Sequence, residues 1–248
     1  MVWAACEGLN HIDTISGTLF RLVESQEQVA TLGYVDTLAE QTLLEEMLEE
    51  VKPSYPSDIG NYQYLLITPF RYPPLRWGSR FGRTSETSLF YAGCSPATTL
   101  AESAFYRLVF LDSMEGVTEE DKIRSEHTLF SVDYQSNNGV KLHAPPFNQY
   151  RSELTHSTDY SHAQQLGSDM RAAGVTAFEY ESARDSNGGH CVALFNTSSF
   201  RQKAPSSMTQ WLCETSLQGT SFKQLDASNV VHFSRDAFLI NGGLPLPA

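Results

Sequence analysis

Strand-like apolar segments and helical segments alternate only in part along this chain, and that arrangement limits the folds it can adopt. We expect strands at residues 62–70, 88–92, 127–134, 175–182, 190–196 and 230–235. We expect helices at residues 37–51, from 96 onward, and at 159–174. The triplets at 137–139, 187–189 and 241–243 predict turns. A sequence of this kind favours an α+β fold over a doubly wound parallel sheet.

The helix expected after residue 95 has the clearest local signal. Ser95 is a good N-cap, and Pro96 suits the first helical position. The apolar stripe of this helix consists of Ala97, Leu100, Ala101, Ala104, Leu108 and Leu111. Glu102 lies well away from the stripe at about 100° per residue. The core does not need Glu102, so its carboxylate is either solvated or directed at a site.

Residues 1–60 are interpreted as an N-terminal extension and residues 61–248 as a single domain. Thr37 and Glu40 have the spacing of a capping box at the start of the helix expected over 37–51. Leucines occupy one face of that helix and glutamates the other. The favoured interpretation is a helix whose apolar face covers a core and whose acidic face lies in solvent. The alternative is a helix that binds a partner.

The net charge of −12 argues against general binding to nucleic acids or to an anionic membrane surface. No stretch approaches the ~20 apolar residues of a membrane span, and the N-terminus does not resemble a signal peptide. The four cysteines form no C-x-x-C pair, and the seven histidines form no H-E-x-x-H motif. We therefore expect a cytoplasmic protein with reduced thiols and no metal site.

Positive charge is concentrated in one part of this acidic chain. Residues 59–85 contain no acidic side chain, and they contain Arg71, Arg76, Arg80 and Arg83. A guanidinium group donates two parallel hydrogen bonds to a phosphate and does not lose its charge. This cluster indicates a small anionic ligand, although each arginine taken alone has the ordinary interpretation of a surface residue.

Two further residues, Tyr91 and Glu102, suggest chemistry on a nucleotide, whereas Ser182 taken alone is uninformative. Tyr91 could stack on a base or a sugar, or it could be a core aromatic. Glu102 could bind ribose hydroxyls beside a developing oxocarbenium ion, whose charge a carboxylate stabilises. Ser182 lies outside any G-x-S-x-G motif, which argues against a hydrolase elbow.

Four stretches together resemble one known family. They are FRYPP with Arg71, GSRFG with Arg80, LFYAGCSPATTLAES from Tyr91 to Glu102, and YESAR with the following GG and VALFN from Ser182 onward. In this order they resemble the RES domain, whose members are the toxin halves of bacterial toxin–antitoxin pairs. The resemblance implies a fold like that of the ADP-ribosyltransferases. It also implies cleavage of the nicotinamide–ribose bond of NAD, with water or phosphate as the acceptor.

The resemblance also implies roles for individual residues. Arg80 would hold the diphosphate, Tyr91 would pack against nicotinamide or its ribose, and Glu102 would polarise the bond that breaks. These three form the expected catalytic set, and the expected substrate-binding set is Arg71, Arg83, Ser182 and Arg184. Either Arg80 or Arg83 could match the second arginine of the family. NAD is expected as a substrate, phosphate as an alternative co-substrate, and no cofactor is expected.

Two other functions remain open from the sequence. One is transfer of ADP-ribose to a protein target, and the other is a non-catalytic NAD-binding module. The resemblance implies a cognate Xre-like antitoxin with a helix-turn-helix domain as the partner. We expect no direct contact with nucleic acid or membrane. We expect either a homodimer or a toxin–antitoxin hetero-oligomer.

Overall fold

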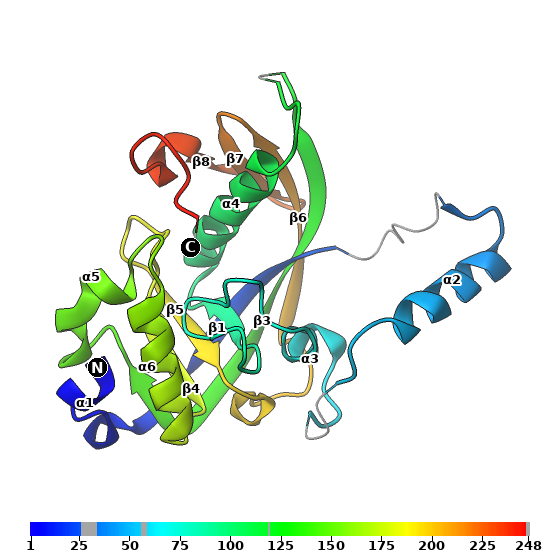
Figure 1. The fold of residues 1–248 in the computed structure, drawn as a ribbon. Coiled ribbons are helices and arrows are strands. Elements are labelled where there is room, and N and C mark those ends of the chain that lie inside the picture. The colour runs from blue at the N-terminus through cyan, green and yellow to red at the C-terminus, as the bar shows by residue number, and fades with distance from the viewer. Residues whose placement is uncertain (26–33, 56–58, 119, 247–248) are drawn as a thin grey trace.

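The computed structural model describes residues 1–25, 34–55, 59–118 and 120–246, and in these ranges the strands form one eight-stranded sheet (Figure 1). The sheet order is β1-β2-β5-β4-β3-β6-β7-β8, and β1 also pairs with β3. The strands are β1 (Asp13–Glu24), β2 (Phe90–Gly93), β3 (Ile123–Lys141), β4 (Ala177–Glu181), β5 (His190–Leu194), β6 (Ser207–Ser216), β7 (Gly219–Gln224) and β8 (Val230–Ser234). The mixed sheet and separate helices confirm the α+β class.

The strand β3 organises the sheet. It pairs antiparallel with β1 over residues 127–139 and with β6 over residues 123–131, and its last residues, 139–141, pair parallel with β4. Phe20 of β1 pairs with Gly93 of β2, so β1, β2, β5, β4 and β3 form a closed ring of pairings. The strands β6, β7 and β8 extend the sheet beyond this ring.

The helices of the described residues are α1 (Val2–Ala5), α2 (Leu38–Glu50), α3 (Tyr64–Arg71), α4 (Pro96–Asp112), α5 (Arg151–Leu154) and α6 (Ser161–Ala172). All except α2 bury residues against the strands, and they do so on both faces of the sheet. Leu66 of α3 packs in one cluster with Phe90 and Val192, whereas Leu166 of α6 packs in another with Ala193. Because successive strand residues point to opposite faces, α3 and α6 lie on opposite sides of the sheet.

The first part of the expected N-terminal extension is an integral strand. β1 pairs with β3 from Asp13 to Glu24, and Ile15 and Leu19 are buried in the core. These two buried residues are four positions apart and have polar residues between them. The segment therefore lacks the alternation of apolar and polar residues that would have predicted a strand. The division of the chain at residue 60 stays a prediction.

The expected helix over 37–51 is present as α2, with both hydrogen bonds of the capping box between Thr37 and Glu40. It stands away from the sheet in Figure 1. Leu43 and Met47 are each 56% exposed. The expectation that this helix covers a core is therefore not met among the described residues.

Two local predictions were wrong. Residues 62–70 were expected to form a strand, but Tyr64–Arg71 is the helix α3, which buries Leu66 and Phe70 on one side. A short apolar run has no period that separates a buried strand from a buried helix. The expected turn at 137–139 lies inside β3, where Gly139 pairs with Ala177.

Most of the other expected elements are present. The strand segments at 88–92, 127–134, 175–182, 190–196 and 230–235 contain or overlap β2, β3, β4, β5 and β8, and the expected polar helix is α6. β6 and β7 were missed. No helix in the described part of the chain is long and apolar enough to cross a membrane.

Candidate active site

The helix α4 directs Glu102 away from its buried stripe, as the sequence predicts. The Ser95 hydroxyl oxygen accepts a hydrogen bond from the Thr98 amide at 3.1 Å, which fixes the start of the helix. Thr98 in turn donates its hydroxyl proton to the Asp185 carboxylate at 2.9 Å. α4 is therefore tied to the loop that follows β4, and Glu102 faces the same loop one turn later.

Ser182 fixes the direction of the Glu102 carboxylate. The Ser182 Oγ atom accepts hydrogen bonds from the amides of Arg184 at 3.1 Å and Asp185 at 2.9 Å. Its proton is donated to Glu102 Oε1 at 2.5 Å. Because both amides occupy the acceptor side of this buried hydroxyl, its proton has one direction left. The carboxylate is therefore oriented before any ligand arrives.

A glycine pair makes this close approach of loop and helix possible. Gly188 has a positive φ of 71°. A Cβ atom at Gly189 would lie 2.1 Å from Thr98 Oγ1 and 2.2 Å from Asp185 Oδ2. Any larger residue at position 189 would push the loop away from α4, and with it Ser182 from Glu102.

Two arginines lie beside this pair and are held by backbone carbonyls. Arg80 donates to the carbonyl oxygens of Leu154 at 3.2 Å and His156 at 2.7 Å. Arg184 is buried and donates to the carbonyl oxygen of Ser157 at 3.0 Å. Both guanidinium groups are therefore anchored on the end of α5 and on the segment that follows it.

Aromatic rings pack against the two guanidinium groups. The Arg80 guanidinium lies 4.4 Å from the centre of the Tyr160 ring, and that of Arg184 lies 3.6 Å from the centre of the Phe105 ring. Burial lowers the pKa of Arg184, Tyr160 raises it, Arg80 lowers it and Glu102 raises it. The opposing charges thus act on one another across a single site.

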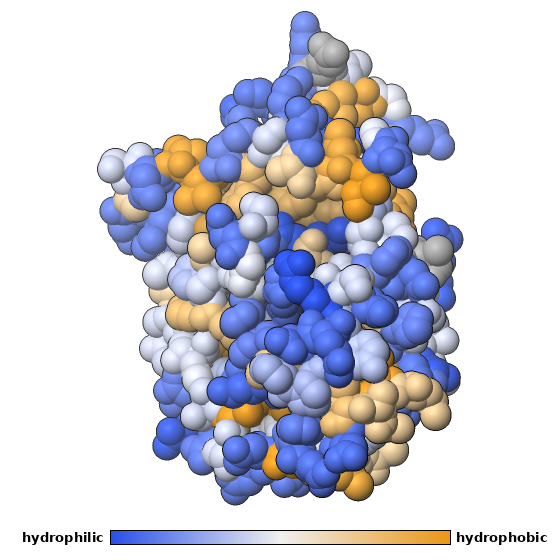
Figure 2. Space-filling model, turned by 90° about the vertical axis from the view of Figure 1, so that its left-hand side faces the viewer, coloured by the Kyte–Doolittle hydropathy of each residue, from blue (hydrophilic) through white to orange (hydrophobic). Residues whose placement is uncertain are grey.

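We call the residues Arg80, Glu102, Tyr106, Tyr160, Ser182 and Arg184 the Glu102 cluster. Figure 2 shows the side of the molecule that lies on the left in Figure 1, and this surface has a hollow with hydrophilic residues at its base and apolar residues above it. Burial raises the pKa of Tyr180 well above its usual range, and the charges of Cys191 and Glu102 raise it further. Tyr180 therefore stays neutral behind the cluster.

Tyr91 lies behind this site and positions the segment that carries Arg80. Its hydroxyl group is 2.9 Å from Ser79 Oγ and accepts the Phe81 amide at 3.1 Å. Burial raises the pKa of Tyr91 to about 12, which keeps the hydroxyl protonated. Contact between Tyr91 and nicotinamide stays a prediction.

The structure separates the other expected arginines from the Glu102 cluster. Arg83 is exposed and donates to Gln165 of α6. Arg80 is thus the arginine of this pair that joins the cluster. Arg71 forms an ion pair with Glu49 at 2.7 Å, on the α3 side of the sheet. Its expected place in the same pocket as Arg80 is not observed, because α3 packs on the opposite face.

Sequence reasoning missed Tyr106, Tyr160 and Arg21. Tyr106 follows Glu102 by four residues on α4, and this helical spacing is a signal that could have identified it. Tyr160 lies directly before α6 and carries no comparable signal. Arg21 interrupts an apolar run in β1 and donates to the Tyr91 carbonyl at 2.5 Å.

The chemistry available to the Glu102 cluster is that of an oriented carboxylate beside two fixed cations. The carboxylate can accept hydrogen bonds from hydroxyl groups and stabilise nearby positive charge, and the arginines can bind phosphates. Among the described residues, no group of three or more histidine, cysteine, aspartate or glutamate side chains could hold a metal ion.

Comparison with known proteins places the chain in a family. The crystal structure of the M. tuberculosis MbcT–MbcA toxin–antitoxin complex is similar with a TM-score of 0.46 and 12% identity, over 83% of this chain and 92% of that chain. No curated protein sequence matches significantly. The RES domain matches residues 56–215, which is more than half of the sequence. The chain therefore belongs to the RES domain family.

Proposed function

We propose that this protein cleaves the nicotinamide–ribose bond of NAD and acts as the toxin of a toxin–antitoxin pair. The observation that carries the proposal is the Glu102 carboxylate, whose direction Ser182 fixes at 2.5 Å and which shares its surroundings with Arg80 and Arg184. Membership of the RES domain family supports the same activity.

The reaction needs what this cluster offers. When the bond between the ribose carbon and the nicotinamide nitrogen breaks, its electron pair goes to the nitrogen, and nicotinamide leaves as a neutral molecule. Positive charge then develops on the ribose. A preorganised carboxylate stabilises that charge in the transition state. Because the leaving group is neutral, the step requires no general acid, and the task of Glu102 is electrostatic.

The two arginines account for binding of the remaining part of NAD. Its diphosphate carries negative charge, and Arg80 and Arg184 provide guanidinium groups held in place by the carbonyls of residues 154–157. The acceptor completes the reaction. With water, an oxygen atom bonds to the ribose carbon and one proton is released; with phosphate, a phosphate oxygen forms that bond.

The test is incubation of the purified protein with NAD, with and without phosphate, followed by mass measurement of the products. ADP-ribose under both conditions identifies a glycohydrolase, and an added phosphate on the ribose identifies a phosphorylase. A mass increase on a protein target would identify transfer of ADP-ribose instead. NAD binding without turnover would contradict the proposal.

The toxin role has its own test in cells. Expression in bacteria without an antitoxin should lower cellular NAD and stop growth, and co-expression of a cognate Xre-like antitoxin should restore both. Cells that hold soluble, folded protein and keep normal NAD levels would contradict this role. The catalytically impaired Glu102→Gln variant is the matched control.

A further inference from the structure

A second cluster of cations lies on the other face of the sheet. There a cavity of about 460 Å³ is lined by residues of β1, α2 and α3 and by the segment after α2. This volume is in the range of small-molecule sites. Its basic residues are Arg21, Lys52 and Arg71, and its tyrosines are Tyr55, Tyr64 and Tyr72. We call it the α3 cavity.

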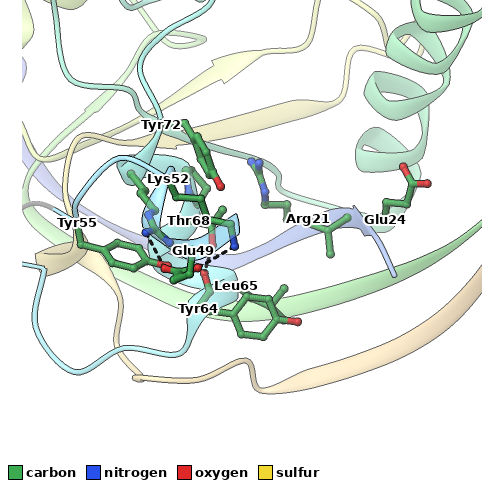
Figure 3. Close-up of a pocket in the computed structure, with 12 residues that line it drawn as sticks. Arg21, Glu24, Glu49, Lys52, Tyr55, Tyr64, Leu65, Thr68 and Tyr72 are labelled. Atoms are coloured by element: carbon green, nitrogen blue, oxygen red, sulfur yellow. Dashed lines mark hydrogen bonds and ion pairs between the residues drawn. The ribbon is translucent and has the colours of Figure 1, made fainter. Parts of the chain in front are cut away.

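The Glu49 carboxylate forms ion pairs with two of the cations of this cavity. Glu49 of α2 lies 2.7 Å from Arg71 and 2.8 Å from Lys52 (Figure 3). The Arg71 side chain is only 9% exposed, whereas that of Glu49 is 55% exposed. Hydrogen bonds from Arg71 and then from Lys52 lower the pKa of Glu49. The cation is thus part of the cavity wall, and the anion reaches it from solvent.

Arg21 gives an independent sign of an unfilled anion position. Its Nε atom is buried and has no hydrogen-bond partner among the described residues. Burial lowers its pKa to about 10, so the group stays positively charged at neutral pH. In Figure 3 Arg21 lies apart from the paired Glu49 and Lys52. A buried unpaired donor on a charged group is costly unless a ligand completes it.

We propose that the α3 cavity is a second anion-binding site, which takes a nucleoside diphosphate or a similar phosphate-bearing aromatic ligand that displaces Glu49. The phosphates would bind Arg71, Lys52 and Arg21, and the tyrosines that line the cavity would receive the aromatic part. The cation of Arg71 already lies 4.3 Å from the centre of the Tyr55 ring, so charge and aromatic surface adjoin.

This site is connected to the opposite face by a short series of hydrogen bonds. Arg21 donates to the Tyr91 carbonyl, and the Tyr91 hydroxyl binds Ser79 and the Phe81 amide on either side of Arg80. Ligand binding at Arg21 therefore acts on a residue that positions Arg80. The proposal does not depend on NAD cleavage, because it concerns different side chains on another face.

The test is calorimetric titration with ADP, which lacks the nicotinamide–ribose bond and cannot be consumed by NAD cleavage. Arg71→Met should weaken ADP binding at this site at least tenfold, whereas Arg83→Met, which removes an exposed arginine outside both clusters, should leave it within about twofold. Glu49→Gln should tighten it roughly two- to fivefold, the scale of an exposed ion pair. Glu46→Gln, which makes the same charge change on α2, should leave binding unchanged.

The opposite results would overturn the proposal. If Arg80→Met abolishes ADP binding and Arg71→Met does not, the ligand sits in the Glu102 cluster. Absence of binding up to millimolar ADP would also contradict the site. Pyrophosphate that binds as tightly as ADP would remove the aromatic part of the proposal. The gain in affinity expected for Glu49→Gln cannot result from misfolding. The proposal can therefore still be tested if the Arg71→Met variant proves too unstable to measure.

Discussion

The two faces of the sheet each bring a glutamate to an arginine-rich region, but they hold it differently. Glu102 is half-buried and takes its direction from Ser182, whose other bonds go to backbone amides. Glu49 is largely exposed on a helix that stands away from the sheet, and among the described residues its carboxylate pairs with Arg71 and Lys52. A carboxylate whose direction is fixed by a buried hydroxyl group suits catalysis, whereas an exposed carboxylate held by ion pairs suits exchange for another anion.

The largest effect should come from Glu102→Gln. This change keeps the shape and the hydrogen bond from Ser182 but removes the charge. We expect kcat for NAD cleavage to fall by roughly 10²-fold or more, with NAD binding and melting temperature retained. Steady-state kinetics and thermal melts check this. A folded variant with near-normal turnover would falsify the assigned role and reduce Glu102 to a structural residue.

Arg80→Ala should act mainly on substrate binding. Contacts to phosphate are made in the ground state and the transition state alike, so their loss raises KM more than it lowers kcat. We expect KM to rise roughly 10- to 100-fold, the equivalent of one charge-assisted contact. Arg83→Ala is the control, because Arg83 is exposed and points to α6. Equal effects of both changes would show that the cluster has been assigned the wrong arginine.

Ser182→Ala tests whether the carboxylate must be oriented. We expect kcat to fall about tenfold with little change in KM, because a misplaced catalytic group acts on the chemical step. Stability should drop by about 1–3 kcal/mol, since two amides lose their acceptor. Ser186→Ala, in the same loop but exposed, should change neither quantity. Unchanged kcat in a destabilised Ser182 variant would leave the residue only a structural role.

Tyr91→Phe should have a smaller effect, and that effect should be on stability. Tyr91 is the residue that links the two faces. The change removes the bonds to Ser79 and Phe81, and we expect a loss of about 1 kcal/mol in stability. The wild-type pKa of about 12 lies above the ordinary value of 10, so the tyrosine contributes stability below pH 10 that is lost as pH rises through 12. Denaturant unfolding at pH 9 and pH 11 should show this decline, and the variant should show less of it.

Glu49→Gln should have the smallest effect on catalysis. NAD turnover should change less than about twofold, because Glu49 lies on the face opposite Glu102. Its exposed ion pairs also contribute little to stability, within about 1 kcal/mol. Turnover measured beside that of Glu46→Gln checks this. A large change in kcat would show that the two faces form one site.

The sequence predicted the parts of the site that depend on local chemistry. Ser95 and Pro96 marked the start of α4, and the 3.6-residue period then placed Glu102 off the buried stripe. It could not predict the face on which Arg71 lies. Residues 62–70 form a short apolar run whose pattern fits a buried strand and a buried helix equally well, and they were interpreted as a strand. Nor could it predict the bond between Ser182 and Glu102, which joins residues 80 positions apart through the packing of a loop on a helix.

Tyr91 belongs to both faces at once, since its carbonyl oxygen meets Arg21 and its hydroxyl meets Ser79 and Phe81. The contact with Arg21 is made by the backbone and survives any substitution, whereas the contacts with Ser79 and Phe81 are made by the side chain and do not. A side-chain change at this position therefore acts on the segment that carries Arg80, and only a backbone shift acts on both faces together.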